Sequence, residues 1–132
     1  MLAELARSEN LQLQGESLGI NLRSGMRPDG VDMERRTLVE AYAHIGKLKG
    51  AQLHKVKGDI LKLILLERKL GGIWRKILCF ADESEAETAR GKSWIAEAVR
   101  EFEIEVVVTP LPSSLAGRVT EAQSRQRMVN PE

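Results

Sequence analysis

The second half of the chain alternates between segments with helical and strand character, and this alternation is the strongest constraint on its fold. Between residues 51 and 70 apolar side chains recur at helical spacing, and Gly71 and Gly72 then end the pattern. The run "WRKILCFA", residues 74–81, has strand length and is typical of a strand covered on both faces. A helix that links two parallel strands forms a right-handed crossover and covers the sheet. We therefore expect an α/β domain with a central mixed β-sheet flanked by helices.

Shorter signals indicate the remaining elements. Ser84 and Glu87 have the S-x-x-E spacing of a capping box, which predicts one helix over residues 84–101, although Gly91 weakens its middle. The other predicted elements are helices over residues 2–13 and 112–127 and strands over residues 20–22 and 104–111.

Length and composition indicate a single globular domain. The chain has 132 residues, of which 42% are hydrophobic and 30% charged, and its Pro and Gly residues are not gathered into a linker. We expect one domain over residues 1–132, with residues 1–14 and 128–132 peripheral or flexible.

The single cysteine and the short apolar runs indicate a reducing compartment. Cys79 lies in the apolar run "ILCFA", which predicts a buried thiol and neither a nucleophile nor a metal ligand. No apolar run approaches the roughly 20 residues needed to cross a bilayer, and "MLAELARSEN" lacks the apolar core of a signal peptide. We therefore expect a cytoplasmic protein without a membrane partner.

The charge is nearly balanced overall but is locally basic. A net charge of +1 excludes a globally basic nucleic-acid binder. Residues 44–57, however, contain Lys47, Lys49, Lys55 and Lys57 and no acidic residue. Such a segment suits contact with a phosphate backbone, and it also suits a solvated loop and helix start. We take Lys47, Lys49 and Lys57 as candidate contacts to a nucleic-acid backbone.

Two acidic residues lie in a predicted hairpin. Its strands are residues 26–31 and 36–43, joined by the polar loop "DMER". If Val31 pairs with Arg36, Glu40 is the diagonal neighbour of Asp29 on one face of the sheet. Two carboxylates that converge in this way repel each other, and an oxygen-ligand cation such as Mg²⁺ removes that cost.

Each of these acids also has a simpler explanation. Asp29 stands between Pro28 and Gly30 and can be an ordinary turn residue. Glu40 can form a cross-strand ion pair with Arg27. Trp74 and Trp94 are expected to fill the edge of the core, because neither lies in an aromatic-rich strand.

The hairpin and the helix after it resemble a known family. "RPDG", followed after seven residues by "LVEAY" and then by "GAQLHKVKGD", is similar to the PD-(D/E)xK nuclease superfamily, which has the restriction-endonuclease-like fold. The resemblance spans roughly residues 26–111. It implies that Asp29, Glu40 and the carbonyl of Ala41 bind Mg²⁺ or Mn²⁺ and that the substrate is DNA.

One position departs from the family pattern. Tyr42 stands where the family has a lysine that orients water and stabilises charge at the phosphate. Another cation must replace this lysine if the chain cleaves DNA. A polar stripe of Gln52, Lys55, Asp59 and Lys62 runs along the predicted helix over residues 51–70. From this stripe we choose Gln52 and Lys55 as the catalytic partners of the two acids.

Three functions follow from these observations. The first is a metal-dependent deoxyribonuclease that hydrolyses phosphodiester bonds. The second is a non-catalytic domain of the same fold that binds nucleic acid or a protein. The third is an assembly module that forms a homodimer through its helices. Enzymes acting on small molecules are disfavoured, because the chain has no Gly-rich phosphate loop, nucleophile elbow or Cys/His ligand set.

Overall fold

The computed structural model describes residues 1–14, 25–44, 50–111 and 122–123, and its centre is a four-stranded mixed sheet in the order β1-β2-β3-β4. β1 (Gly30–Asp32) runs antiparallel to β2 (Thr37–Tyr42), whereas β2, β3 (Arg75–Phe80) and β4 (Ile104–Val108) are parallel. The α/β class with a mixed sheet and flanking helices is thus confirmed.

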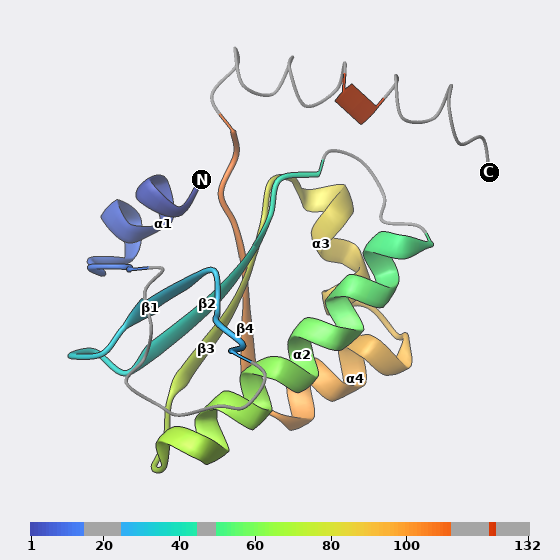
Figure 1. Cartoon of the computed structure of the whole chain (residues 1–132). Coiled ribbons are helices and arrows are strands. Elements are labelled where there is room, and N and C mark those ends of the chain that lie inside the picture. The colour runs from blue at the N-terminus through green and yellow to red at the C-terminus, as the bar shows by residue number, and fades with distance from the viewer. Residues whose placement is uncertain (15–24, 45–49, 112–121, 124–132) are drawn as a thin grey trace.

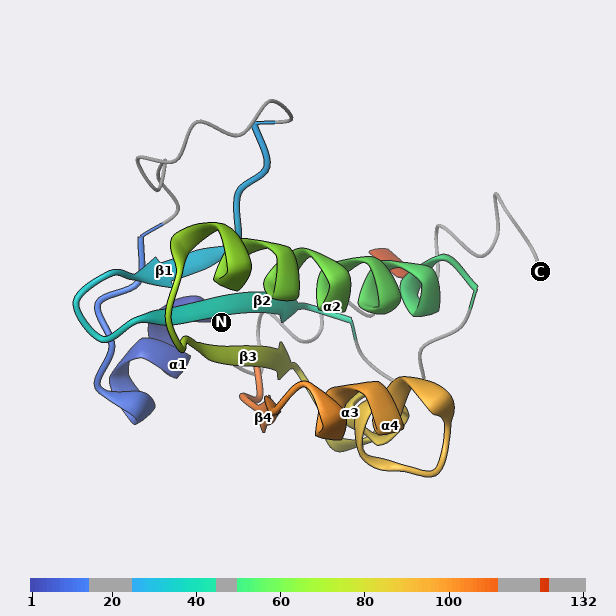
Figure 2. The same ribbon diagram turned by 90° about the horizontal axis from the view of Figure 1, so that it is seen from below.

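Helices cover both faces of this sheet. α1 (Leu2–Glu9) lies on one face, and α2 (Ala51–Leu70), α3 (Glu83–Arg90) and α4 (Trp94–Glu101) lie on the other (Figure 1). The bounds of α2 are those predicted, because its periodic apolar positions and the glycines after it are local signals. α2 runs back along β2 in the opposite direction (Figure 2). This direction decides which residues of α2 meet which residues of β2.

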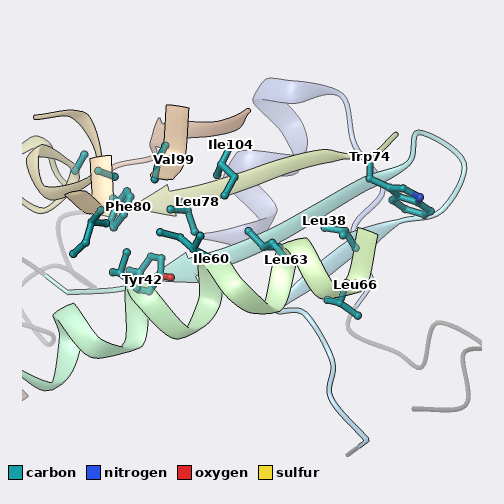
Figure 3. Packing of buried hydrophobic residues seen from close by; sticks show 14 of the residues in the cluster. Leu38, Tyr42, Ile60, Leu63, Leu66, Trp74, Leu78, Phe80, Val99 and Ile104 are labelled. Atoms are coloured by element: carbon teal, nitrogen blue, oxygen red, sulfur yellow. The ribbon is translucent and has the colours of Figure 1, made fainter. Parts of the chain in front are cut away.

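The larger core fills the space between α2 and the sheet. Ile60, Leu63 and Leu66 point from α2 toward Leu38 and Leu78 on the strands (Figure 3). At one end of this core the ring of Tyr42 stacks on Phe80, with ring centroids 4.8 Å apart. Apolar burial of this kind is the main force that holds helix and sheet together.

A smaller core lies on the opposite face, under α1. Leu5 and Leu11 are buried there against Val39, Ile77 and Cys79. The prediction that Cys79 is buried is confirmed. The first 14 residues, which we expected at the periphery or flexible, thus contribute two buried leucines to a core.

The prediction of one continuous helix over residues 84–101 is wrong. The structure breaks it into α3 and α4, because each half has its own N-cap. Asp82 accepts a hydrogen bond from the N–H of Glu85, at 2.8 Å, and Ser93 accepts one from the N–H of Ala96, at 3.2 Å. Asp82, and not Ser84, therefore begins α3.

Two strands are shorter than predicted, and several predicted elements fall outside the described residues. The first strand of the hairpin is limited to β1, and the predicted strand over residues 104–111 ends at Val108. The predicted strand over residues 20–22, the C-terminal tail over 128–132 and all but residues 122–123 of the predicted last helix lie outside the described part of the chain.

Candidate functional site

The hairpin register differs from our prediction by two residues. Val31 pairs with Leu38 and not with Arg36, so the loop runs over residues 33–36. The carboxylate of Asp32 accepts a hydrogen bond from the N–H of Arg35, at 2.9 Å, and Arg36 takes a left-handed conformation with φ 50°. These local contacts shape a loop that apolar alternation alone does not encode.

The corrected register brings the two acids closer together. Continued by one residue beyond the Gly30–Val39 pair, it places Asp29 directly opposite Glu40 instead of diagonal to it. A shift of two residues leaves every side chain on its original face, so the predicted sharing of one face is retained. One oxygen of Asp29 also accepts a hydrogen bond from the backbone N–H of Ala41, at 2.9 Å. Asp29, which is exposed, is thus fixed to the strand that carries Glu40.

Glu40 is buried beneath α2, where its side chain is only 1% exposed. The ammonium of Lys62 lies 2.7 Å from its Oε1, an ion pair that lacks hydrogen-bond alignment. The pKa of Glu40 is raised to about 8, mainly by burial and also by the nearby carboxylates of Asp29 and Asp59, whereas Lys62 opposes the shift. The buried carboxyl of Glu40 therefore retains its proton more readily than an exposed glutamate does.

A second polar cluster adjoins this pair at the end of β2. The hydroxyl of Tyr42 donates a hydrogen bond to Oδ2 of Asp59, at 2.7 Å, and Lys55 donates to the same oxygen, at 2.9 Å. The Lys55 ammonium also lies 4.4 Å from the centre of the Tyr42 ring. Burial and the charge of Asp59 hold the pKa of Tyr42 far above its usual range, so the phenol stays protonated. Tyr42 is therefore a hydrogen-bond donor within this cluster and cannot supply the positive charge of the family lysine.

The lysine that contacts the acid pair is Lys62, whereas our choice from the sequence was Lys55. Because α2 runs antiparallel to β2, a later helix residue lies above an earlier strand residue. Lys62 therefore reaches Glu40, and Lys55 reaches Tyr42, two residues further along the strand. The polar stripe already contained Lys62, but choosing between the two lysines requires the direction of the helix.

The other predicted site residues lie in different surroundings. Gln52 is half-buried in the first turn of α2. Lys57 lies over the ring of Trp94, with its ammonium 5.2 Å from the ring centre. Lys47 and Lys49 lie outside the described residues. The alternative ion pair of Glu40 with Arg27 is not the arrangement found, since Lys62 is the cation at Glu40.

The chemistry of the acid pair suits a hard divalent cation. In the described part of the chain no three His, Cys, Asp or Glu side chains gather closely enough to form a metal site by themselves. Mg²⁺, however, is commonly held by one or two carboxylates and several water molecules. Asp29 and Glu40 supply two such carboxylates opposite each other, and a metal ion bound there would replace the proton that burial favours on Glu40.

Comparisons with protein-family models, curated proteins and solved structures gave no significant match. Among the described residues, no helix combines the length and the apolar character needed to cross a membrane.

Proposed function

We propose that this chain is a metal-dependent nuclease of the restriction-endonuclease-like fold that hydrolyses phosphodiester bonds of DNA. The observation that carries the proposal is the placement of Asp29, the residue before β1, opposite Glu40 on β2, with Lys62 of α2 against the buried acid. The hairpin, α2 and the parallel strand β3 also follow each other in the order that the family resemblance implies.

Asp29 and Glu40 would hold Mg²⁺ or Mn²⁺, with the carbonyl oxygen of Ala41 as a further ligand. When bound, such an ion polarises a phosphoryl oxygen and lowers the pKa of a coordinated water. The chain's own contribution is geometric. The hydrogen bond from Ala41 fixes the Asp29 carboxylate, and burial fixes that of Glu40.

Lys62 takes the place of the missing family lysine. Its side chain is 21% exposed, so its ammonium lies between the buried acid and solvent. A phosphate that approaches the acid pair would meet this positive charge, which stabilises the additional negative charge of the transition state. Lys55 is less suited to this role because Asp59 and the Tyr42 ring already engage it.

The first test measures cleavage of plasmid and single-stranded DNA with Mn²⁺. We expect cleavage by the wild type and a loss of at least about a hundredfold for Glu40→Gln and for Lys62→Met, which is typical of removing a group that stabilises developing charge. Lys69→Met, a change at an exposed lysine of the same helix, is the matched control and should retain activity. If Lys55→Met abolishes cleavage and Lys62→Met does not, the catalytic lysine is the one chosen from the sequence.

The second test measures thermal stability with and without Mn²⁺ and does not depend on the substrate. A ligand at a hundredfold excess over its Kd stabilises a protein by about 2.7 kcal/mol. Wild type should gain stability, whereas Asp29→Asn and Glu40→Gln should gain almost none. Equal gains in all three proteins would place the ion elsewhere and contradict the site.

One observation favours a non-catalytic alternative. The ammonium of Lys62 lies 2.7 Å from Glu40, so this ion pair can serve a purely structural role. In that case the domain binds nucleic acid or a partner protein, including a second copy of itself, without cleavage. DNA binding that persists in EDTA, together with no cleavage and no stabilisation by Mn²⁺, would indicate this alternative. A dimeric hydrodynamic mass, together with no DNA binding at low salt, would identify an assembly module.

A further inference from the structure

The two tryptophans of the chain lie in opposite environments. Trp74 is 5% exposed, and its indole N–H donates a hydrogen bond to the carbonyl of Gly71. Trp94 is 62% exposed, although we expected both rings at the edge of the core. That expectation is wrong for Trp94, because α4 begins at this residue and buries the side that carries Ile95 and Val99.

A cation from another helix covers the exposed ring. The ammonium of Lys57 lies 5.2 Å from the centre of the Trp94 ring, and this contact links α2 to α4, which cover the same face of the sheet (Figure 1). A lysine over a tryptophan face is a favourable cation–π contact. Proteins that bind single-stranded nucleic acid combine the same two groups: the aromatic ring stacks on a base, and the cation contacts a phosphate.

Charged residues of both signs lie close to this pair in the sequence. Lys92, which is exposed, precedes α4 by two residues, and the first turn of α2 carries no acidic side chain. Glu97, also exposed, is the acid in the first turn of α4. Lys55 and Lys62 face β2 from the opposite flank of α2 and are engaged by acids there. Lys57 therefore gives positive charge to the α4 side of the helix.

We propose that Trp94 and Lys57 form a stacking subsite for an unpaired base of single-stranded nucleic acid. The base stacks on the exposed indole ring, and Lys57 contacts the adjoining phosphate. Single strands are the fitting partner because their bases have free faces, whereas the faces of paired bases are stacked within a duplex. The choice of nucleic acid as the partner rests on the proposed function.

The test is a binding titration of the full chain with a fluorescently labelled oligothymidylate in EDTA, so that cleavage cannot interfere. We expect the oligonucleotide to quench Trp94 emission in the wild type, while the buried Trp74 provides the emission that remains. Trp94→Leu should abolish quenching and weaken binding about tenfold, which corresponds to the loss of one stacked base. Lys57→Gln should weaken binding and make it less sensitive to salt.

Two matched controls separate the subsite from a general surface effect. Ile73→Ala changes an exposed apolar residue beyond the opposite end of α2, and Lys69→Gln changes an exposed lysine in its last turn. Both should bind as the wild type does, and a duplex of equal length should compete poorly.

Wild-type affinity of Trp94→Leu would overturn the proposal. So would a change from dimer to monomer in Trp94→Leu, because a second copy would then be the partner of the ring. Binding in EDTA that depends on Trp94 supports the subsite even if no cleavage is ever found. Cleavage that depends on Glu40 but not on Trp94 supports the nuclease and contradicts the subsite.

Discussion

At the residue scale, Glu85 is an acid that is buried without a full complement of partners. Its side chain is 0% exposed, and one oxygen accepts a hydrogen bond from the N–H of Ala81, at 2.7 Å. The other oxygen lies 3.6 Å from Nδ1 of His44, too far for a direct hydrogen bond. Glu85 thus links the start of α3 to the ends of β2 and β3. Burial raises its pKa to about 8, opposed by the Ala81 N–H and assisted by the charge of Asp82.

This shift predicts that stability falls as the pH rises. The folded pKa of Glu85 lies above the ordinary value of 4.5, so the folded state holds a proton that the unfolded chain releases. The stabilisation is complete below about pH 4.5 and is lost as the pH rises through about 8. In metal-free buffer, the unfolding free energy should decrease by up to about 8 kcal/mol between pH 5 and pH 9 if two such groups titrate. Glu40, whose pKa is also raised to about 8, is the second of them.

Glu85→Gln keeps the size of the side chain and removes its titration. We expect this variant to lose about half of the pH dependence that urea unfolding shows for the wild type. Glu83→Gln, at an exposed acid two residues earlier in α3, should leave the dependence unchanged. The same slope in wild type and Glu85→Gln would mean that Glu85 is ionised at neutral pH.

At the element scale, α2 depends on packing more than on its own sequence. Its N-cap is Gly50, without a side-chain cap, and Gly58 interrupts its second turn. Gly58 is exposed, and a methyl group added there would meet no atom within 4 Å. Glycine in a helix interior costs about 0.5–1 kcal/mol relative to alanine. Among the described residues, no steric constraint therefore requires a glycine at position 58.

Gly58→Ala should accordingly raise the unfolding free energy by about 0.5–1 kcal/mol, measured by urea denaturation. Gly72→Ala is the opposing control. Gly72 has φ +76°, and a methyl group there would clash with the guanidinium of Arg36, which itself hydrogen-bonds the carbonyl of Gly71. That variant should be less stable than the wild type. A loss of stability in Gly58→Ala would show that the outer surface of α2 is covered.

At the scale of the whole molecule, the sheet is held between two unequal cores. The core under α2, α3 and α4 is large, whereas the core under α1 depends on a helix of eight residues. Arg75 connects this helix to the opposite edge of the sheet by ion pairs with Glu9 and Glu105. Because few contacts hold α1, we expect it to detach before the rest of the fold opens.

Cys79, the only cysteine, lies in the smaller core and can report this opening. Leu5→Ala removes a fully buried side chain of α1 and should cost about 2–5 kcal/mol if α1 unfolds with the domain, or less if α1 detaches locally. In either case the thiol of Cys79 should react faster with a thiol reagent. Leu63→Ala, a change in the larger core, should accelerate that reaction only as far as it lowers global stability. Equal acceleration by both variants at matched stability would show that the two cores open together.

Several features of this protein follow from its sequence alone. The bounds of α2 and the position of β3 do so because apolar periodicity and glycine stops act over a few residues. The common face of Asp29 and Glu40 follows too, because side chains alternate along a strand and a register shift of two residues preserves the face. The burial of Cys79 was predicted from the apolar residues around it.

Tertiary structure decided the features that depend on how distant segments meet. The choice of Lys62 over Lys55 depends on α2 running antiparallel to β2, which the spacing of residues along the helix does not reveal. The burial of Glu40 likewise requires α2 to lie over the strand. The break between α3 and α4, and with it the exposure of Trp94, depends on the caps at Asp82 and Ser93 and on which side of each helix meets the sheet. A local pattern fixes the faces of an element, but only packing determines what each face contacts.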